Sequence, residues 1–165
     1  MGAGIAQVGL TAGLNVVLYD VTHEASAKAK SEIAGRLNRV VAKGQLTAER
    51  QADAELRLTL AGSLADLRQA DIVIEAIVER LEPKRALFRE LEAVVSPQAI
   101  LATNTSSLSV AAIGAQCTHK DRVCGLHFFN PVPIMNLVEV ITTPDTSLPW
   151  PNPCSPWQRR SAKHL

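Results

Sequence analysis

The sequence has little of several features that mark particular classes of protein. No apolar run approaches the ~18 residues of a membrane-spanning helix, and the N-terminus lacks the basic start and apolar core of a signal peptide. Three cysteines, an odd number without metal-ligand spacing, favour a reducing compartment over a disulfide framework. The net charge of +1 indicates neither a basic nucleic-acid surface nor an acidic tail. These scarcities predict a cytoplasmic protein that binds no membrane, nucleic acid or metal ion.

What the sequence does contain is enough apolar material for one core. Hydrophobic residues make up 47% and charged residues 20% of the 165 residues, as in ordinary globular proteins, and this length supports one sizeable domain. The composition changes sharply after Ser147, where both tryptophans and several prolines fall in a segment without any core-forming period. We therefore assign residues 1–147 to one domain and expect residues 148–165 to form an irregular tail.

Apolar runs and amphipathic stretches alternate along the first 141 residues. Short apolar runs bounded by turn residues predict strands, and apolar positions at helical spacing predict helices. The segment 71–76 is almost continuously apolar, as buried parallel strands are. The alternation predicts a doubly wound α/β fold with a mostly parallel sheet. The expected strands are 15–20, 56–61, 71–76, 100–102, 123–128 and 137–141, and the expected helices are 2–12, 22–42, 49–54, 64–69, 83–95 and 108–115.

A histidine and a carboxylate each lie in one of two apolar runs near the end of the predicted domain. His127 lies in the run 123–128, and Glu139 lies in the run 137–141. Pro131 and Pro133 break the chain between them, so two buried strands are expected to lie side by side, with the imidazole facing the carboxylate in a mostly apolar setting. A carboxylate partner holds one imidazole tautomer and suits a histidine to general-base work near neutral pH. A purely structural histidine at a strand end is the alternative.

Gly2 and Gly4 open an expected helix, and Asp20 ends the strand that follows it. A dinucleotide site needs free amides at a helix N-terminus for the pyrophosphate and an acid about 20 residues further on for a ribose. The acid favours NAD over NADP, because NADP sites place a basic residue near the ribose phosphate. A flexible N-terminus explains the two glycines equally well.

Four motifs follow one another along residues 1 to about 147: Met1–Gln7, Ile74–Glu79, Thr103–Leu108 and Gly125–Pro133. In this order they closely resemble the NAD-binding domain of the 3-hydroxyacyl-CoA dehydrogenases, and HFFNPVP downstream of NTSSL is highly specific. The resemblance implies a Rossmann-like fold with NAD as cofactor and an acyl-CoA as substrate. It also implies oxidation of (3S)-3-hydroxyacyl-CoA to 3-oxoacyl-CoA in fatty-acid or phenylacetate-type β-oxidation.

The resemblance implies roles for individual residues. His127 matches the base that takes the proton of the substrate 3-hydroxyl, Glu139 the carboxylate that stabilises the imidazolium, and Ser106 a serine that hydrogen-bonds the reacting oxygen. The positions matched to the cofactor are Gly2, Gly4, Asp20, Ala76, Glu79, Lys84, Ser106 and Asn130. Those matched to the CoA substrate are Lys43, Lys84 and Ser106. As alternatives, Ser106 would cap the next helix, Glu79 would pair with Lys84, and both lysines would be ordinary surface residues.

The family pattern is incomplete at both ends of this chain. Met1 aligns inside the glycine motif, so we expect the first strand to be missing, and beyond Ser147 we expect no helical C-terminal domain, through which the family would form homodimers. Three hypotheses follow: a NAD-dependent dehydrogenase, an inactive fragment that retains at most weak NAD binding, and a non-enzymatic scaffold similar to λ-crystallin. By descent the residues favour the dehydrogenase; for the isolated chain, the incomplete sheet favours the fragment.

Overall fold

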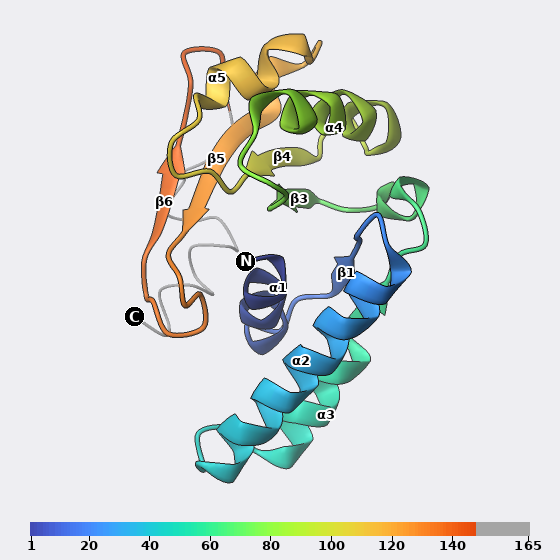
Figure 1. Cartoon of the computed structure of the whole chain (residues 1–165), viewed down its shortest axis with the longest axis vertical. Helices are drawn as coiled ribbons and strands as arrows, with labels where there is room; N and C mark the ends of the chain where they lie inside the picture. The colour runs from blue at the N-terminus through green and yellow to red at the C-terminus, as the bar shows by residue number, and fades with distance from the viewer. Residues whose placement is uncertain (148–165) are drawn as a thin grey trace. The chain divides into compact units, whose positions relative to one another are not determined.

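The computed structural model describes residues 1–147, and the tail predicted for residues 148–165 lies outside the described residues (Figure 1). The described chain forms two compact units. The first unit comprises Met1–Asp66 together with Asn130–Ile134. The second unit comprises Leu67–Phe129 together with the described residues from Met135 onward.

The first unit is built around a pair of parallel strands and three helices. Its elements are α1 (Gly2–Thr11), β1 (Val16–Leu18), α2 (His23–Ala42), α3 (Ala48–Leu56) and β2 (Leu58–Leu60). The strands pair in parallel with Val16 opposite Leu58. The helices bury their apolar faces against each other and against the strands, as amphipathic helices do. The resulting core contains Ala6, Leu10, Ile33, Leu37, Ala54 and Leu58.

Glycines set the ends of two helices and one close approach in this unit. Gly13 follows α1 with φ of 85° and Gly44 follows α2 with φ of 70°, a left-handed conformation that residues with a Cβ rarely adopt. On α1, a Cβ at Gly4 would lie 3.0 Å from the Cβ of Val132. The absence of a side chain at Gly4 therefore lets the segment Asn130–Ile134 pack directly on α1. The peptide bond between Asn130 and Pro131 is cis.

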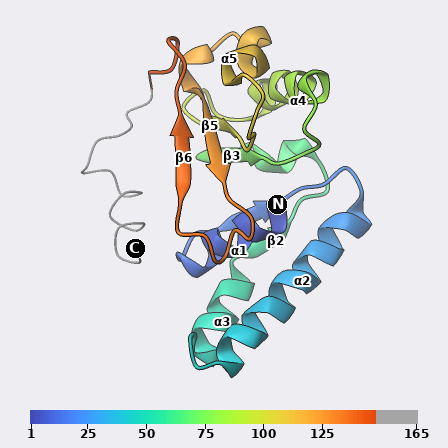
Figure 2. The ribbon, with the colours of Figure 1, turned by 60° about the vertical axis from the view of Figure 1, so that its left-hand side comes forward.

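The second unit contains a four-stranded sheet in the order β3-β4-β5-β6. The strands are β3 (Ile72–Glu75), β4 (Ile100–Thr103), β5 (Val123–Phe128) and β6 (Val138–Ile141). The first three are parallel, whereas β6 runs antiparallel to β5, as Figure 2 shows. The parallel strands are nearly continuous in apolar residues, which suits strands covered on both faces. Ala102, Cys124 and Leu126 form the centre of this core.

Two helices pack on this sheet. They are α4 (Leu81–Val94), which buries Phe88 and Leu91, and α5 (Val110–Ile113), which lies beside α4 (Figures 1 and 2). Short 3-10 turns complete the unit: η1 (Leu64–Leu67) begins in the first unit and enters the second, and η2 (Gly114–Gln116) and η3 (Lys120–Arg122) precede β5. No helix within residues 1–147 combines the length and apolar character needed to span a membrane.

The structure confirms the α/β Rossmann-like class and changes three local expectations. The strands form two sheets, one of two and one of four strands, where one sheet was expected. The expected helix 108–115 is shorter, because the Ser109 side chain accepts a hydrogen bond from the Ala112 amide at 3.2 Å and so caps a helix that starts at Val110. Strand β6 was expected to be buried, and it is exposed along most of its length.

Candidate active site

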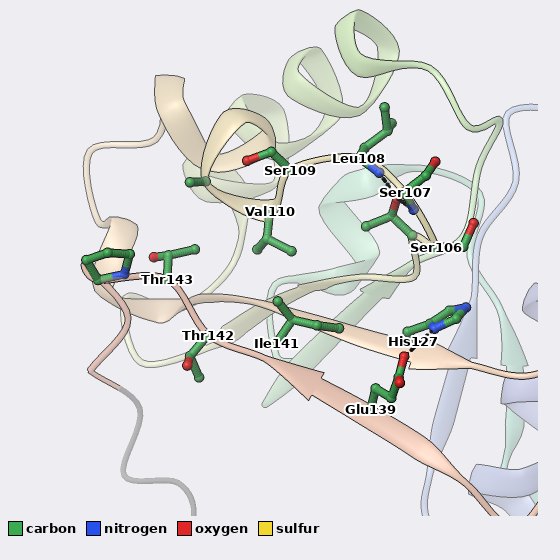
Figure 3. Close-up of a pocket in the computed structure, with 13 residues that line it drawn as sticks. Ser106, Ser107, Leu108, Ser109, Val110, His127, Glu139, Ile141, Thr142 and Thr143 are labelled. Carbon is green, nitrogen blue, oxygen red and sulfur yellow. Dashed lines mark hydrogen bonds and ion pairs between the residues drawn. The ribbon is translucent and has the colours of Figure 1, made fainter.

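The antiparallel pairing of β5 with β6 brings His127 and Glu139 together. The two residues lie directly opposite each other in the ladder, and His127 Nδ1 is 2.8 Å from Glu139 Oε2. Figure 3 shows the two side chains pointing toward one another from neighbouring strands. Because an ionised carboxylate only accepts hydrogen bonds, Nδ1 carries the proton in this pair. The neutral imidazole therefore keeps the lone pair of Nε2 for another partner.

The surroundings of this pair differ from the apolar setting expected for it. The side chain of His127 is 18% exposed, whereas that of Glu139 is 54% exposed. The reason is the position of β6 at the edge of the described sheet, with Val138 and Val140 also open to solvent. Glu139 is thus a solvated carboxylate, and its ion pair with a protonated His127 is weaker than a buried pair would be.

Phe129, which was not predicted as a site residue, is a neighbour of His127. Its ring centroid lies 4.5 Å from that of His127, with the two planes inclined by 48°. The pair HxF puts the two rings on one side of an extended chain, because side chains two residues apart share a face. The two-residue spacing of His127 and Phe129 is therefore the sequence signal from which this contact could have been predicted. Phe129 and Glu139 together restrict the imidazole, one through its ring and the other through Nδ1.

A pocket of about 380 Å³ opens beside the pair. It is lined by residues 105–111 of the loop and helix after β4, by His127 and Glu139, and by residues 141–144 at the end of β6. Ser106 is exposed on this loop and lies in the same pocket as the imidazole (Figure 3). The structure therefore brings all three expected catalytic residues to one pocket. Ser106 does not cap α5, since Ser109 does so.

Glu79 holds the loop that carries Ser106. Its carboxylate accepts a hydrogen bond from the Thr105 hydroxyl, and its Oε1 accepts one from the Ser106 amide at 3.1 Å. Lys84 Nζ lies 3.3 Å from the other oxygen, Oε2. The alternative of a local Glu79–Lys84 pair is thus observed. Burial raises the pKa of Glu79, but the bonds from Thr105, Lys84 and Ser106 outweigh it, so that the pKa lies below its ordinary value.

The lowered pKa of Glu79 predicts a loss of stability in acid. A carboxyl whose pKa is lower in the folded than in the unfolded chain stabilises the fold when ionised, and this contribution disappears as the pH falls through the folded-state pKa. We therefore expect the urea midpoint to decrease as the pH falls below the ordinary glutamate value of 4.5. In Glu79→Gln this decrease should be smaller. An identical pH dependence in the variant and the unmodified chain would contradict the assignment.

Lys84 is the expected cofactor and CoA residue whose placement differs most from the expectation. Its side chain is 0% exposed, and its ammonium group contacts the equally buried carboxylate of Glu75 at 2.7 and 2.9 Å. Glu75 also accepts from the Thr103 hydroxyl at 2.7 Å and the Ile77 amide at 2.6 Å. In this structure Lys84 presents no surface to a CoA molecule. Glu75 was not predicted as part of the site, although a carboxylate within the apolar segment 71–76 indicates a buried partner.

The residues expected to hold the adenosine half of the cofactor lie in the first unit. Met1 is the N-cap of α1 and makes no side-chain capping bond among the described residues, and the first turn carries no acidic residue. The first amides of a helix have no intrahelical acceptor and attract anions; in α1 this concerns the amides before Gly4, because the Gly4 amide donates to the Met1 carbonyl oxygen at 2.8 Å. Apart from its chain neighbours and the backbone of α1, no described residue has an atom within 4 Å of the position that a Cβ at Gly2 would occupy, so a phosphate has room to approach. Asp20 is exposed after β1. These features fit NAD.

The other three residues predicted to bind the cofactor or CoA, Lys43, Ala76 and Asn130, are exposed or half-buried. Lys43 is exposed at the C-terminus of α2, and Asn130 is exposed beside the cis peptide bond, both in the first unit. Ala76 is half-buried directly after β3 in the second unit, and its neighbours Ile77 and Val78 are 43% and 62% exposed. Unlike Lys84, which is fully buried, these three residues are at least partly exposed.

Comparison with known proteins finds a matching family and relatives of high sequence identity. The family profile described as the NAD-binding domain of 3-hydroxyacyl-CoA dehydrogenase matches residues 1–150. The chain is 50% identical over 142 residues to the 3-hydroxyadipyl-CoA dehydrogenase of Escherichia coli, which covers 86% of this chain and 30% of the relative. It is 43% identical over 153 residues to the human mitochondrial hydroxyacyl-coenzyme A dehydrogenase, which covers 89% of this chain and 49% of the relative.

Solved structures agree with these sequence matches. The crystal structure of (S)-3-hydroxybutyryl-CoA dehydrogenase from Ralstonia eutropha superposes with a TM-score of 0.86 at 41% identity and covers 89% of this chain and 52% of that protein. The chain spans about half or less of the length of these relatives. The matched residues cover both units and include the pocket that contains His127, Glu139 and Ser106. The chain therefore belongs to the 3-hydroxyacyl-CoA dehydrogenase family, and residues 1–150 correspond to the NAD-binding domain of that family.

Proposed function

We propose that this chain carries the proton-transfer machinery of an oxidoreductase that converts (3S)-3-hydroxyacyl-CoA to 3-oxoacyl-CoA with NAD. The observation that supports this most directly is the 2.8 Å contact between His127 Nδ1 and Glu139 Oε2 at a pocket that also contains Ser106. A histidine whose Nδ1 is bound by a carboxylate has its other nitrogen available as a base.

In this proposal, His127 Nε2 takes the proton of the substrate 3-hydroxyl. Bound NAD would supply the acceptor for the hydride of carbon 3, the carbon that bears this hydroxyl. The imidazolium that forms is stabilised by Glu139, which plays the electrostatic role of the acid in a hydrolase triad. Ser106 donates its hydroxyl hydrogen to the reacting oxygen and so orients the substrate. We propose cofactor contacts, from the family resemblance alone, for the following residues: Gly2, Gly4, Asp20, Ala76, Glu79, Ser106 and Asn130.

The substrate class and setting are also proposals. The relatives include 3-hydroxyadipyl-CoA and 3-hydroxybutyryl-CoA dehydrogenases, and this supports the proposal of a 3-hydroxyacyl-CoA substrate and a place in a β-oxidation-type pathway. We propose Lys43, exposed on the surface, as a contact of the CoA moiety. Cys117 and Cys124 are free thiols within the described residues, as a reducing cytoplasm favours. A homodimer is proposed from the family resemblance alone.

The second candidate is the fragment hypothesis, NAD binding without turnover, which the match of residues 1–150 to an NAD-binding domain supports by itself. The chain spans 30% of the Escherichia coli relative and 49% of the human one. A non-enzymatic scaffold is less well supported, because the described structure keeps the His127–Glu139 contact.

An assay of the purified chain separates the two candidates. NADH oxidation is measured with acetoacetyl-CoA, and NAD binding is measured separately by calorimetry. The dehydrogenase proposal expects both binding and substrate-dependent oxidation of NADH, whereas the fragment proposal expects binding alone. Asp20→Ala serves as the control for binding, because it removes the proposed ribose contact and should weaken NAD binding without changing the His127 pocket. Absence of both binding and turnover would contradict both candidates.

A further inference from the structure

The buried pair of Lys84 with Glu75 has no substrate-facing surface, yet it lies next to the loop that carries Ser106. Both side chains are 0% exposed. A charge pair of this kind is costly to desolvate, so that its retention calls for further hydrogen bonds that satisfy it. Glu75 receives such bonds from Thr103 at the end of β4 and from the Ile77 amide after β3. The pair therefore joins the ends of two parallel strands.

From Lys84 the contacts continue toward the pocket. Its ammonium group lies 3.3 Å from Glu79 Oε2 and 3.5 Å from the carbonyl oxygen of Asn104. Glu79 in turn accepts from the Thr105 hydroxyl and the Ser106 amide. The side chain of Asn104 reaches strand β5, where its Oδ1 accepts a hydrogen bond from the Phe128 amide at 2.9 Å. Phe128 directly follows His127.

We infer that Lys84 is a positioning residue: fixed by Glu75, it fixes Glu79, which holds the Thr105–Ser106 loop against the pocket. The inference rests on the proposed function for the role of Ser106, and it concerns what Lys84 does for the loop through Glu79. The ammonium group has four oxygen neighbours inside the protein, two from Glu75 and one each from Glu79 and Asn104. Lys84 thus acts on the position of Ser106 through the loop.

Hydrogen exchange of the ligand-free chain, followed by NMR, tests this inference without any need for turnover. The variant is Glu75→Gln/Lys84→Met, which removes both buried charges. The glutamine keeps one acceptor oxygen for the Ile77 amide, and its amide nitrogen can donate to the Thr103 hydroxyl, which then serves as acceptor. We expect exchange of the Ser106 amide to rise about tenfold, the change that follows from losing one net hydrogen bond. Glu79→Ala, which removes the acceptor itself, should give a similar rise. Combining all three substitutions should add little, because the residues act in series.

The matched control is Glu32→Gln/Arg36→Met, which removes an exposed ion pair of α2 and should leave Ser106 exchange unchanged. The amide of Leu101 in the core of the second unit reports global unfolding. If exchange of the Leu101 amide rises as much as exchange of the Ser106 amide, the pair variant is unfolding globally. Glu79→Gln then replaces it, because this substitution keeps the acceptor oxygen for Ser106 but removes the charge that attracts Lys84. Unchanged Ser106 exchange in a folded variant would overturn the inference.

A second measurement separates this inference from the proposed function. With acetoacetyl-CoA and NADH, the pair variant is expected to lose kcat by roughly tenfold or more through misplacement of Ser106, while KM for the CoA substrate changes by less than about twofold. A raised KM at unchanged kcat would indicate direct contact of Lys84 with the CoA and would overturn the positioning role. If the unmodified chain shows no turnover, the proposed function fails, and the exchange experiment still decides the role of Lys84.

Discussion

Replacement of His127 by glutamine is expected to lower kcat/KM for acetoacetyl-CoA reduction by about 10²–10⁴-fold, the usual contribution of a positioned general acid–base group. In this direction of the reaction, the imidazolium gives its proton to the oxygen that becomes the 3-hydroxyl. Glutamine keeps a polar side chain of similar reach but cannot exchange a proton near neutral pH. NAD affinity, measured by calorimetry, should change little, because the expected effect lies in proton transfer.

Two companion variants make this result specific. His119→Gln changes an exposed histidine outside the pocket lining and should retain the activity of the unmodified chain. Glu139→Gln should lose less than His127→Gln, because the base remains and only the partner of Nδ1 changes from a carboxylate to an amide. Turnover that survives His127→Gln at the level of the His119→Gln control would refute the base assignment.

Lys84→Met alone is expected to lower the free energy of unfolding by about 3–5 kcal/mol, the cost of leaving one partner of a buried ion pair without the other. Glu75 would remain 0% exposed with its charge uncompensated. Since small proteins are stable by only about 5–15 kcal/mol, such a loss should be evident in the urea midpoint. Thr103 and the Ile77 amide would still donate to Glu75, which places the expected loss toward the lower end.

The second substitution identifies the cause. Glu75→Gln/Lys84→Met should recover most of the loss, because the uncompensated charge is gone. The exposed pair of α2 provides the comparison: Arg36→Met leaves Glu32 in solvent and should cost about 0–1 kcal/mol. If Lys84→Met destabilises no more than Arg36→Met, the buried pair contributes no more than a surface pair does, and its retention needs another explanation.

The sequence was sufficient for the pairing of the catalytic candidates but not for their environment. Strand 123–128 was predicted with the observed bounds, and the following apolar run was expected beside it, so the contact between His127 and Glu139 followed from the chain break at the prolines. A short apolar run does not reveal whether its strand lies inside a sheet or at an edge. Glu139 was therefore expected to be shielded, and it is more than half exposed.

Contacts between elements that are distant in the sequence were the second feature that could not be predicted. Lys84 matched a ligand-binding position by motif alone, and a motif does not say which way a helix turns its side chains. The burial of Lys84 depends on how α4 packs on the ends of β3 and β4, which involves residues 9 and 20 positions away along the chain. Helix periodicity carries no information on such contacts. The start of α5 was predicted two residues too early for a local reason, because the Ser109 side chain caps the helix.

The register of the β5–β6 ladder has a consequence for how this site tolerates change. Successive side chains of a strand point to opposite faces, so a slip of one residue would bring Val138 or Val140 opposite His127 and turn Glu139 away from it. The contact between His127 and Glu139 thus depends on the pairing register of the two strands and not on the length of the connection between them. Insertions in residues 130–136 that preserve the pairing should be compatible with the pair, whereas a single insertion within 138–141 should abolish it.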